Sequence, residues 1–144
     1  MKVRDIVEIE PEKVDVCVPD DRLSEAAHIL VPEGPGGIVP VVENVQDRKL
    51  IGVVKDTDLW FEAEKRDSAD VSVGDCRMTP ALACSPDDDL EQAVEWMCEQ
   101  DVLHIAVVDR NDKILGVLAM MDVLHRSGSR EAKAFERLLL KREP

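Results

Sequence analysis

Two aspartates occupy equivalent places in the chain, each a few residues after a glycine and two apolar residues. Asp58 follows Gly52-Val53-Val54, and Asp122 follows Gly116-Val117-Leu118. A carboxylate in the first turn of a helix stabilises that helix by about 0.3–1 kcal/mol through the helix dipole. A carboxylate also accepts hydrogen bonds from the hydroxyls of a ligand. Position leaves both roles open, and the recurrence of the pattern favours ligand binding at one or both aspartates.

The other reactive side chains form no catalytic or metal-binding pattern. His28 and His125 lack the spacing of metal ligands relative to one another and to the cysteines, and no Ser-His-Asp or Cys-His arrangement is readable. Asp87-Asp88-Asp89 fits a helix cap followed by a solvated first turn. The cysteines form no CxxC pair, which favours buried, reduced thiols, and they are Cys17, Cys76, Cys84 and Cys98. We expect no enzymatic activity and no metal site.

Composition narrows the class of protein further. The 144 residues carry a formal net charge of −13, and both halves of the chain are acidic, which argues against a nucleic-acid-binding surface. Only the stretch 126–144 has an excess of basic residues. No run of about 18 apolar residues is present, and the first residues lack the apolar stretch of a signal peptide. We therefore expect a cytoplasmic protein without a membrane segment.

The two halves repeat one another. Residues 17–23 align with residues 84–90 at an offset of 67, and the offset falls to 64 where Gly52 aligns with Gly116. A repeat of this length is typical of a unit that completes its core by packing on a neighbouring copy. We assign residues 1–66 to the first unit, 67–126 to the second, and 127–144 to a helical tail.

Each copy predicts the same order of elements, β-α-β-β-α. A short apolar segment precedes a helix whose apolar residues recur at spacings of three and four, and two β-branched strands then form a hairpin. The second helix of each copy begins near Thr57-Asp58 and Met121-Asp122. The expected strands are residues 14–18, 38–42, 50–54, 81–84, 104–108 and 114–118. This pattern predicts an α/β (α+β) fold in which two units pack sheet to sheet around a pseudo-two-fold axis.

These features together resemble a tandem pair of CBS domains, often called a Bateman module. The likeness is carried by the approach 73–80, the Pro-Asp-Asp-x-Leu helix entries at Pro19 and Pro86, and the strands 40–43 and 106–109. The segments Gly52–Asp58 and Gly116–Asp122 resemble the closing motif G-h-h-(T/S)-x-x-D of the family. Each match is weak alone, but all of them occur twice in the same order.

The resemblance implies a cleft between the units that holds up to two ligands, AMP, ADP, ATP or S-adenosylmethionine, and no bound cofactor. In the family motif the aspartate, here Asp58 and Asp122, accepts hydrogen bonds from the ribose hydroxyls. The Ser/Thr that helps to hold phosphate is replaced by Lys55 in copy one and Ala119 in copy two. The other positions at which we expect ligand contacts are Val16, Val39, Pro40, Ala83, His104 and Ile105.

The substituted positions leave alternatives open. Lys55 near a helix N-terminus suits a ligand phosphate, or a neighbouring aspartate, or solvent. Ala119 makes no side-chain hydrogen bond, so copy two loses a helix cap worth about 0.5–2 kcal/mol and is the weaker phosphate site. His104 precedes a strand where nucleotide-binding members often place a basic residue, although a histidine there is also compatible with a structural role.

The sequence as a whole predicts a stand-alone, non-catalytic regulatory module. Occupancy by an adenosine-containing ligand would shift the orientation of the two units and signal to an unidentified regulated protein or within a homodimer. The alternative is a CBS-type interaction module that has lost nucleotide binding. The amphipathic tail 129–143 favours docking on its own protein or a dimer partner over docking on a membrane.

Overall fold

A computed structural model describes residues 1–30, 36–67, 69–79 and 83–126. The first unit contains α1 (Leu23–Leu30), β1 (Ile38–Val42), β2 (Leu50–Lys55) and α2 (Asp56–Lys65). The second contains β3 (Ala83–Cys84), α3 (Leu90–Gln100), β4 (His104–Val108), β5 (Ile114–Ala119) and α4 (Met120–Arg126). Short 3-10 helices η1 (Val3–Asp5), η2 (Pro11–Lys13) and η4 (Val73–Asp75) lie in the segments that lead into the units. The amphipathic helix expected in the tail lies outside the described residues.

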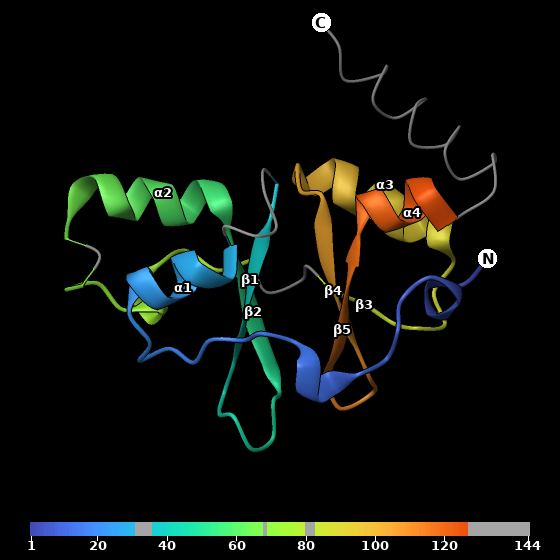
Figure 1. The fold of residues 1–144 in the computed structure, drawn as a ribbon, viewed down its shortest axis with the longest axis horizontal. Helices are drawn as coiled ribbons and strands as arrows, with labels where there is room; N and C mark the ends of the chain where they lie inside the picture. The colour runs from blue at the N-terminus through green and yellow to red at the C-terminus, as the bar shows by residue number, and fades with distance from the viewer. Residues whose placement is uncertain (31–35, 68, 80–82, 127–144) are drawn as a thin grey trace, which may run out of the picture.

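The hairpins and helices confirm the predicted α+β architecture. Strands β1 and β2 pair antiparallel, as do β4 and β5, and β3 pairs parallel to β4. Figure 1 shows the two hairpins side by side in the middle of the molecule, with α1 and α2 beside one and α3 and α4 beside the other. The apolar face of α3 is buried as its spacing predicts, through Leu90, Ala93, Val94, Met97 and Cys98.

The two sheets share a core. Ile38, Val42 and Val53 of the first hairpin belong to the same buried cluster as Ile105 and Leu118 of the second. The turn ends of the two hairpins are also joined by backbone hydrogen bonds. Leu50 N–H donates to the Asp112 carbonyl at 2.8 Å, and Ile114 N–H donates to the Arg48 carbonyl at 3.0 Å. The first hairpin therefore completes the core of the second unit, while α1 and α2 cover a separate buried cluster on that hairpin.

The strand predicted over residues 14–18 is reduced to a single bridge, and this prediction was wrong in extent. Cys17 donates its N–H to the Pro40 carbonyl and accepts a hydrogen bond from Val42 N–H. A longer parallel ladder would need an N–H at position 40, which proline lacks. Copy two has Ala106 at that position, and there Ala83 joins Cys84 in β3.

The helix entries use their aspartates differently from the predicted caps. Asp21 accepts a hydrogen bond from Val18 N–H at 2.9 Å, and Asp88 accepts one from Ser85 N–H at 2.7 Å. No side-chain hydrogen bond caps α3 at Asp89. The Pro-Asp-Asp turns therefore close back on the residue before the proline, because hydrogen bonds from an aspartate to nearby backbone amides compete with capping.

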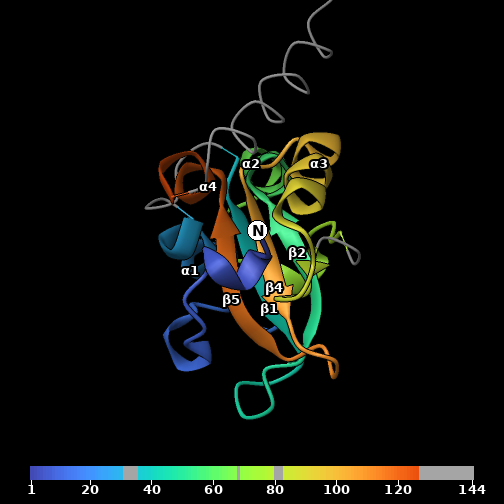
Figure 2. The same ribbon diagram turned by 90° about the vertical axis from the view of Figure 1, so that its right-hand side faces the viewer.

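The segments that lead into the units cross between them. Figure 1 shows the N-terminus beside the second unit, and Figure 2 shows the same segment in front of β5. Val3 N–H donates to the Asp88 carbonyl and Leu90 N–H donates to the Met1 carbonyl, both at 2.9 Å. Conversely, Leu23 N–H of the first unit donates to the Val71 carbonyl at 2.9 Å. The expected unit boundaries at residues 66 and 126 follow the sequence repeat. The segment that leads into each unit along the chain, however, packs on the other unit.

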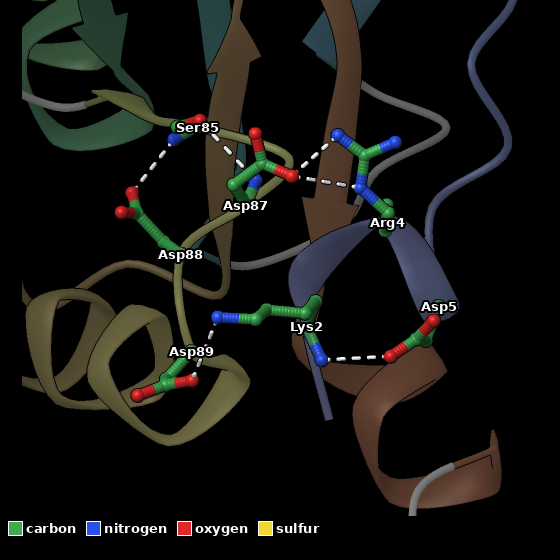
Figure 3. Close-up of polar contacts among 7 residues, drawn as sticks. All are labelled: Lys2, Arg4, Asp5, Ser85, Asp87, Asp88 and Asp89. Atoms are coloured by element: carbon green, nitrogen blue, oxygen red, sulfur yellow. Dashed lines mark hydrogen bonds and ion pairs between the residues drawn. The ribbon is translucent and has the colours of Figure 1, made fainter.

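Exposed ion pairs flank the N-terminal crossing. Lys2 Nζ lies 3.5 Å from Asp89, and Arg4 pairs with Asp87 at 2.5 Å, with all four side chains more than half exposed (Figure 3). The Lys2 N–H donates to the Asp5 carboxylate at 2.8 Å. Exposed pairs of this kind contribute about 0–1 kcal/mol each. The burial of Val3 and Ile6 beneath them is the larger stabilising contribution.

Candidate functional site

A cavity of about 400 Å³ opens where β2 and α2 of the first unit meet the approach to the second unit. Its lining comes from both units and consists of Lys55, Thr57, Asp58, Arg77, Met78, Thr79 and Gln100. We call it the Asp58 cleft. It combines one carboxylate, two cationic side chains and two hydroxyls, which is a set able to bind both a sugar and an anionic group.

Backbone pairing between the units builds this cleft. Thr79 N–H donates to the Val53 carbonyl at 2.9 Å, and Val53 N–H donates to the Thr79 carbonyl at 3.3 Å. Gly52 permits the approach, since a Cβ at that position would lie 3.1 Å from Met78 Cβ. Lys55 Nζ donates to the Gln100 carbonyl at 3.3 Å, at the C-terminal end of α3 where a cation is favourable.

The two aspartates at the start of α2 have different surroundings. The Asp56 carboxylate already has protein hydrogen-bond donors. It accepts hydrogen bonds from Gly36 N–H at 2.9 Å and from Thr57 N–H at 2.8 Å. Asp58 has no hydrogen bond or ion pair within the described residues, and its half-buried carboxylate lines the cleft. Asp56 therefore has a structural role, whereas the acceptor capacity of Asp58 is available to a ligand.

A second cavity, of about 260 Å³, lies between β1 and β5. Its apolar walls include Val14, Ile29, Ile38, Pro40 and Val117, and its other lining residues are Glu8, Glu10, Lys13, Asp15, His104 and Gly116. Lys13 pairs with Glu10 at 2.5 Å, so that its charge is already matched. We call this space the acidic cavity, because carboxylates outnumber cations in its lining.

The structure separates the residues that the sequence suggested as ligand contacts. Lys55 and Asp58 lie together in the Asp58 cleft, and Pro40 and His104 lie in the acidic cavity. The remaining positions line neither cavity as described, and they are Val16, Val39, Ala83, Ile105, Ala119 and Asp122. Contacts from these positions to a ligand stay a prediction.

Burial explains several of these placements. Val39 and Ile105 are at most 1% exposed and form part of the core, while Val16 and Ala83 pack against it. His104 is 7% exposed, and its Nδ1 lies 3.4 Å from the Gly36 carbonyl, so it helps to hold the neighbouring segment. These residues therefore have a packing or hydrogen-bonding role in the fold, and their contacts to a ligand stay a prediction.

Sequence reasoning missed Thr57, Arg77 and Thr79 as candidate site residues. Arg77 and Thr79 were part of the motif that supports the family likeness, but the motif does not show which unit they face. The hydrogen bonds between Thr79 and Val53 place them opposite Asp58 of the other unit. One sequence signal could have pointed to these residues. A glycine such as Gly52, which precedes Asp58 in the motif, permits the close approach of another backbone segment.

The four thiols are buried, and the pKa of three of them is raised. Burial, aided by Asp21 and Glu25, raises the pKa of Cys17 to about 12, and burial aided by Asp88 raises that of Cys84 to about 12. Burial also raises the pKa of Cys76, with Glu62 as the next cause. None of the four cysteines forms a disulfide and all four are buried, which confirms the expectation of buried thiols. A neutral thiol is a poor nucleophile, so Cys17, Cys76 and Cys84 have a role in packing.

The described part of the chain contains neither a membrane-spanning helix nor a metal-binding cluster. Residues 1–30, 36–67, 69–79 and 83–126 contain no helix long and apolar enough to cross a membrane. Within the same ranges, no group of three or more His, Cys, Asp or Glu side chains could hold a metal ion.

Known proteins resemble this chain in both structure and sequence. Over 98% of both chains, the structure matches the crystal structure of CBSX2 in complex with AMP, with a TM-score of 0.66 and 27% identity. The chain is 28% identical over 122 residues to the CBS domain-containing protein YhcV of Bacillus subtilis, covering 83% of each. It is 29% identical over 110 residues to inosine-5′-monophosphate dehydrogenase of Methanocaldococcus jannaschii, covering 75% of this chain. The match spans only 20% of that enzyme's length.

The family model for the CBS domain matches twice, at residues 3–59 and 73–129. The two matches cover most of the chain and correspond to the two copies of the repeat. Each match contains the first helix, the β-hairpin and at least the start of the second helix of one unit, in that order. The chain therefore belongs to the CBS domain family, as a tandem pair of CBS domains.

Proposed function

We propose that this CBS pair is a non-catalytic regulatory module that binds an adenosine-containing ligand in the Asp58 cleft. The observation that carries the proposal is the half-buried Asp58 carboxylate, which has no partner within the described residues and lines a cavity built from both units. A carboxylate accepts two hydrogen bonds from the vicinal hydroxyls of a ribose. The AMP complex of CBSX2, at 27% identity, supports the ligand class.

The position of the cleft supports a regulatory role. Its lining joins α2 of the first unit to the approach of the second, so a ligand would contact both. A ligand that contacts two units favours whichever relative arrangement gives it the better contacts. Occupancy would in this way change the surface presented to a regulated protein. Neither the ligand nor that protein needs to be altered chemically.

Asp58→Ala is expected to abolish stabilisation by ligand. The measurement is the thermal unfolding midpoint of the full chain with millimolar AMP, ADP, ATP, S-adenosylmethionine or NAD, because a ligand of the native state raises the midpoint. The matched control is Asp122→Ala, which removes the equivalent carboxylate at α4. Asp122 lines neither of the two cavities described above. A shift that survives Asp58→Ala but not Asp122→Ala would place the site in the other copy. No shift with any ligand would refute the sensor function and support the interaction-module alternative.

The module is further proposed to act as a homodimer through α2 and α4. Both helices lie along the upper edge of Figure 1 and expose large apolar side chains. Trp60 and Phe61 of α2 are 52% and 56% exposed, and Met121 of α4 is 57% exposed. Aromatic residues and Met are enriched in protein interfaces, where a second copy would cover them.

Trp60→Glu is expected to convert the dimer to a monomer, because a charge replaces an aromatic anchor of the interface. The mass in solution, measured by light scattering after gel filtration, reports the change. Val45→Glu is the matched control, since Val45 is 57% exposed on the hairpin turn after β1, away from α2. A wild-type chain that is monomeric at micromolar concentration would contradict the dimer.

A further inference from the structure

The two copies place different side chains at positions that the fold makes equivalent. Asp56 N–H donates to the Gly37 carbonyl at 3.1 Å, and Met120 N–H donates to the Leu103 carbonyl at 2.8 Å, so α2 and α4 begin at the same place in each copy. Counting from these positions, Ala119 replaces Lys55 and Met121 replaces Thr57. The second copy has therefore lost one cation and one hydroxyl at the start of its helix.

The leading segments differ in the same direction. The 3-10 helices η1 and η4 occupy corresponding places, and Gly116 meets Val7 and the Glu8 carbonyl as Gly52 meets Met78. In this register Val7 corresponds to Arg77, and Ile9 corresponds to Thr79. The second copy thus loses another cation and another hydroxyl.

The Asp58 cleft is suited to an anion at one end. Lys55 uses one ammonium hydrogen on the Gln100 carbonyl, which leaves two others available. Arg77 is exposed and makes no ion pair within the described residues, although it lines the cleft with Thr79. A guanidinium binds phosphate through two parallel hydrogen bonds, while Asp58 can hold a sugar in the same cleft.

The acidic cavity is unsuited to an anion. Glu8 and Asp15 line it without an ion pair in the described part of the chain, and the single ammonium, that of Lys13, is paired with Glu10. A phosphate there would meet carboxylates without a free cation. Like charges repel one another, and the repulsion is strongest where water is excluded.

We propose that Arg77 is the residue that recognises phosphate in this chain, and that a phosphorylated adenosine ligand binds only in the Asp58 cleft, once per chain. This inference rests on the proposed function, because it presupposes that Asp58 holds the adenosine. It adds the residue that holds the phosphate, Arg77, and the reason that the second copy does not take a phosphorylated ligand.

The experiment is calorimetric titration of the full chain with AMP and, separately, with adenosine. Wild type is expected to bind one AMP per chain, more tightly than adenosine, with an AMP affinity that falls as salt is added. Arg77→Ala is expected to weaken AMP binding by about 10- to 100-fold, the loss typical of a hydrogen bond to a charged group. Adenosine binding should be unchanged in Arg77→Ala, since adenosine carries no phosphate.

Two further variants test whether the effect is specific to Arg77 and to its guanidinium group. Arg110→Ala makes the same chemical change at an exposed arginine in the turn between β4 and β5, and is expected to leave both affinities unchanged. Arg77→Lys keeps the charge but loses the two-pronged geometry, and is expected to retain part of the preference for AMP.

The outcomes separate this inference from the proposed function. Two equivalent AMP sites per chain, equal affinity for AMP and adenosine, or an unchanged AMP preference in Arg77→Ala would each overturn the role of Arg77 and leave adenosine binding standing. Failure of both AMP and adenosine to bind would overturn this inference, and the proposed function would fall with it if S-adenosylmethionine also failed to bind.

Discussion

Ile105→Ala is expected to lower the free energy of unfolding by about 2–5 kcal/mol, the range for truncating a buried isoleucine. Ile105 lies on β4, is 1% exposed and pairs with Leu118 of β5. It belongs to the cluster that also contains residues of the first hairpin, so the cavity left by truncation would weaken the core shared by both units. Urea denaturation followed by circular dichroism measures the change.

Ile51→Ala is the matched control for this substitution. Ile51 also lies on a hairpin strand, β2, but is 36% exposed, so the same change in β-propensity occurs with less loss of burial. We expect its effect to be smaller by at least about 1 kcal/mol. A loss of stability at Ile105 no larger than that at Ile51 would contradict the buried core position. A loss of ligand affinity without a loss of stability would support the expected contact between Ile105 and a ligand.

Val3→Asp is expected to destabilise the protein by about 3–5 kcal/mol, because it buries a carboxylate without a partner. Val3 is fully buried in the core of the second unit, although it is the third residue of the chain. That cost is a large fraction of the roughly 5–15 kcal/mol by which a domain is stable. Thermal unfolding measures it, and hydrogen exchange of β4 and β5 should show which unit loses protection first.

Two controls identify the cause of the Val3→Asp effect. Val45→Asp introduces the same charge at a residue that is 57% exposed, and is expected to change stability by less than about 0.5 kcal/mol. Arg4→Ala removes the exposed pair with Asp87 (Figure 3) and is expected to cost at most about 1 kcal/mol. If Val3→Asp were as mild as either control, the N-terminal segment would not be part of the second core.

Local sequence signals predicted the elements well. The strands expected at residues 38–42 and 104–108 match β1 and β4 at both ends, and the second helices begin within one or two residues of the expected positions. These signals are strong because β-branched runs and spacings of three and four are local properties of the chain. The strand at residues 14–18 failed because its extent depends on Pro40, a residue on the partner strand.

The candidate site was only half predictable for a similar reason. Lys55 and Asp58 could be found because they belong to one contiguous motif. Arg77 and Thr79 lie about twenty residues further along and belong to the other copy, so their proximity to Asp58 depends on how the copies pack. A repeat shows that two units associate, but it does not show which segment of one unit faces which segment of the other.

The two aspartates with which the sequence began show this division most clearly. By itself the sequence determined the repeat, the order of elements and the equivalence of Asp58 and Asp122, because each depends on residues that are neighbours along the chain. Only the tertiary structure decided that Asp58 faces Arg77 and Thr79 in a cleft, and that the corresponding approach to the second copy carries Glu8 and Glu10. Charges from distant segments add at a site only once folding has brought them together, so two similar motifs acquire different surroundings.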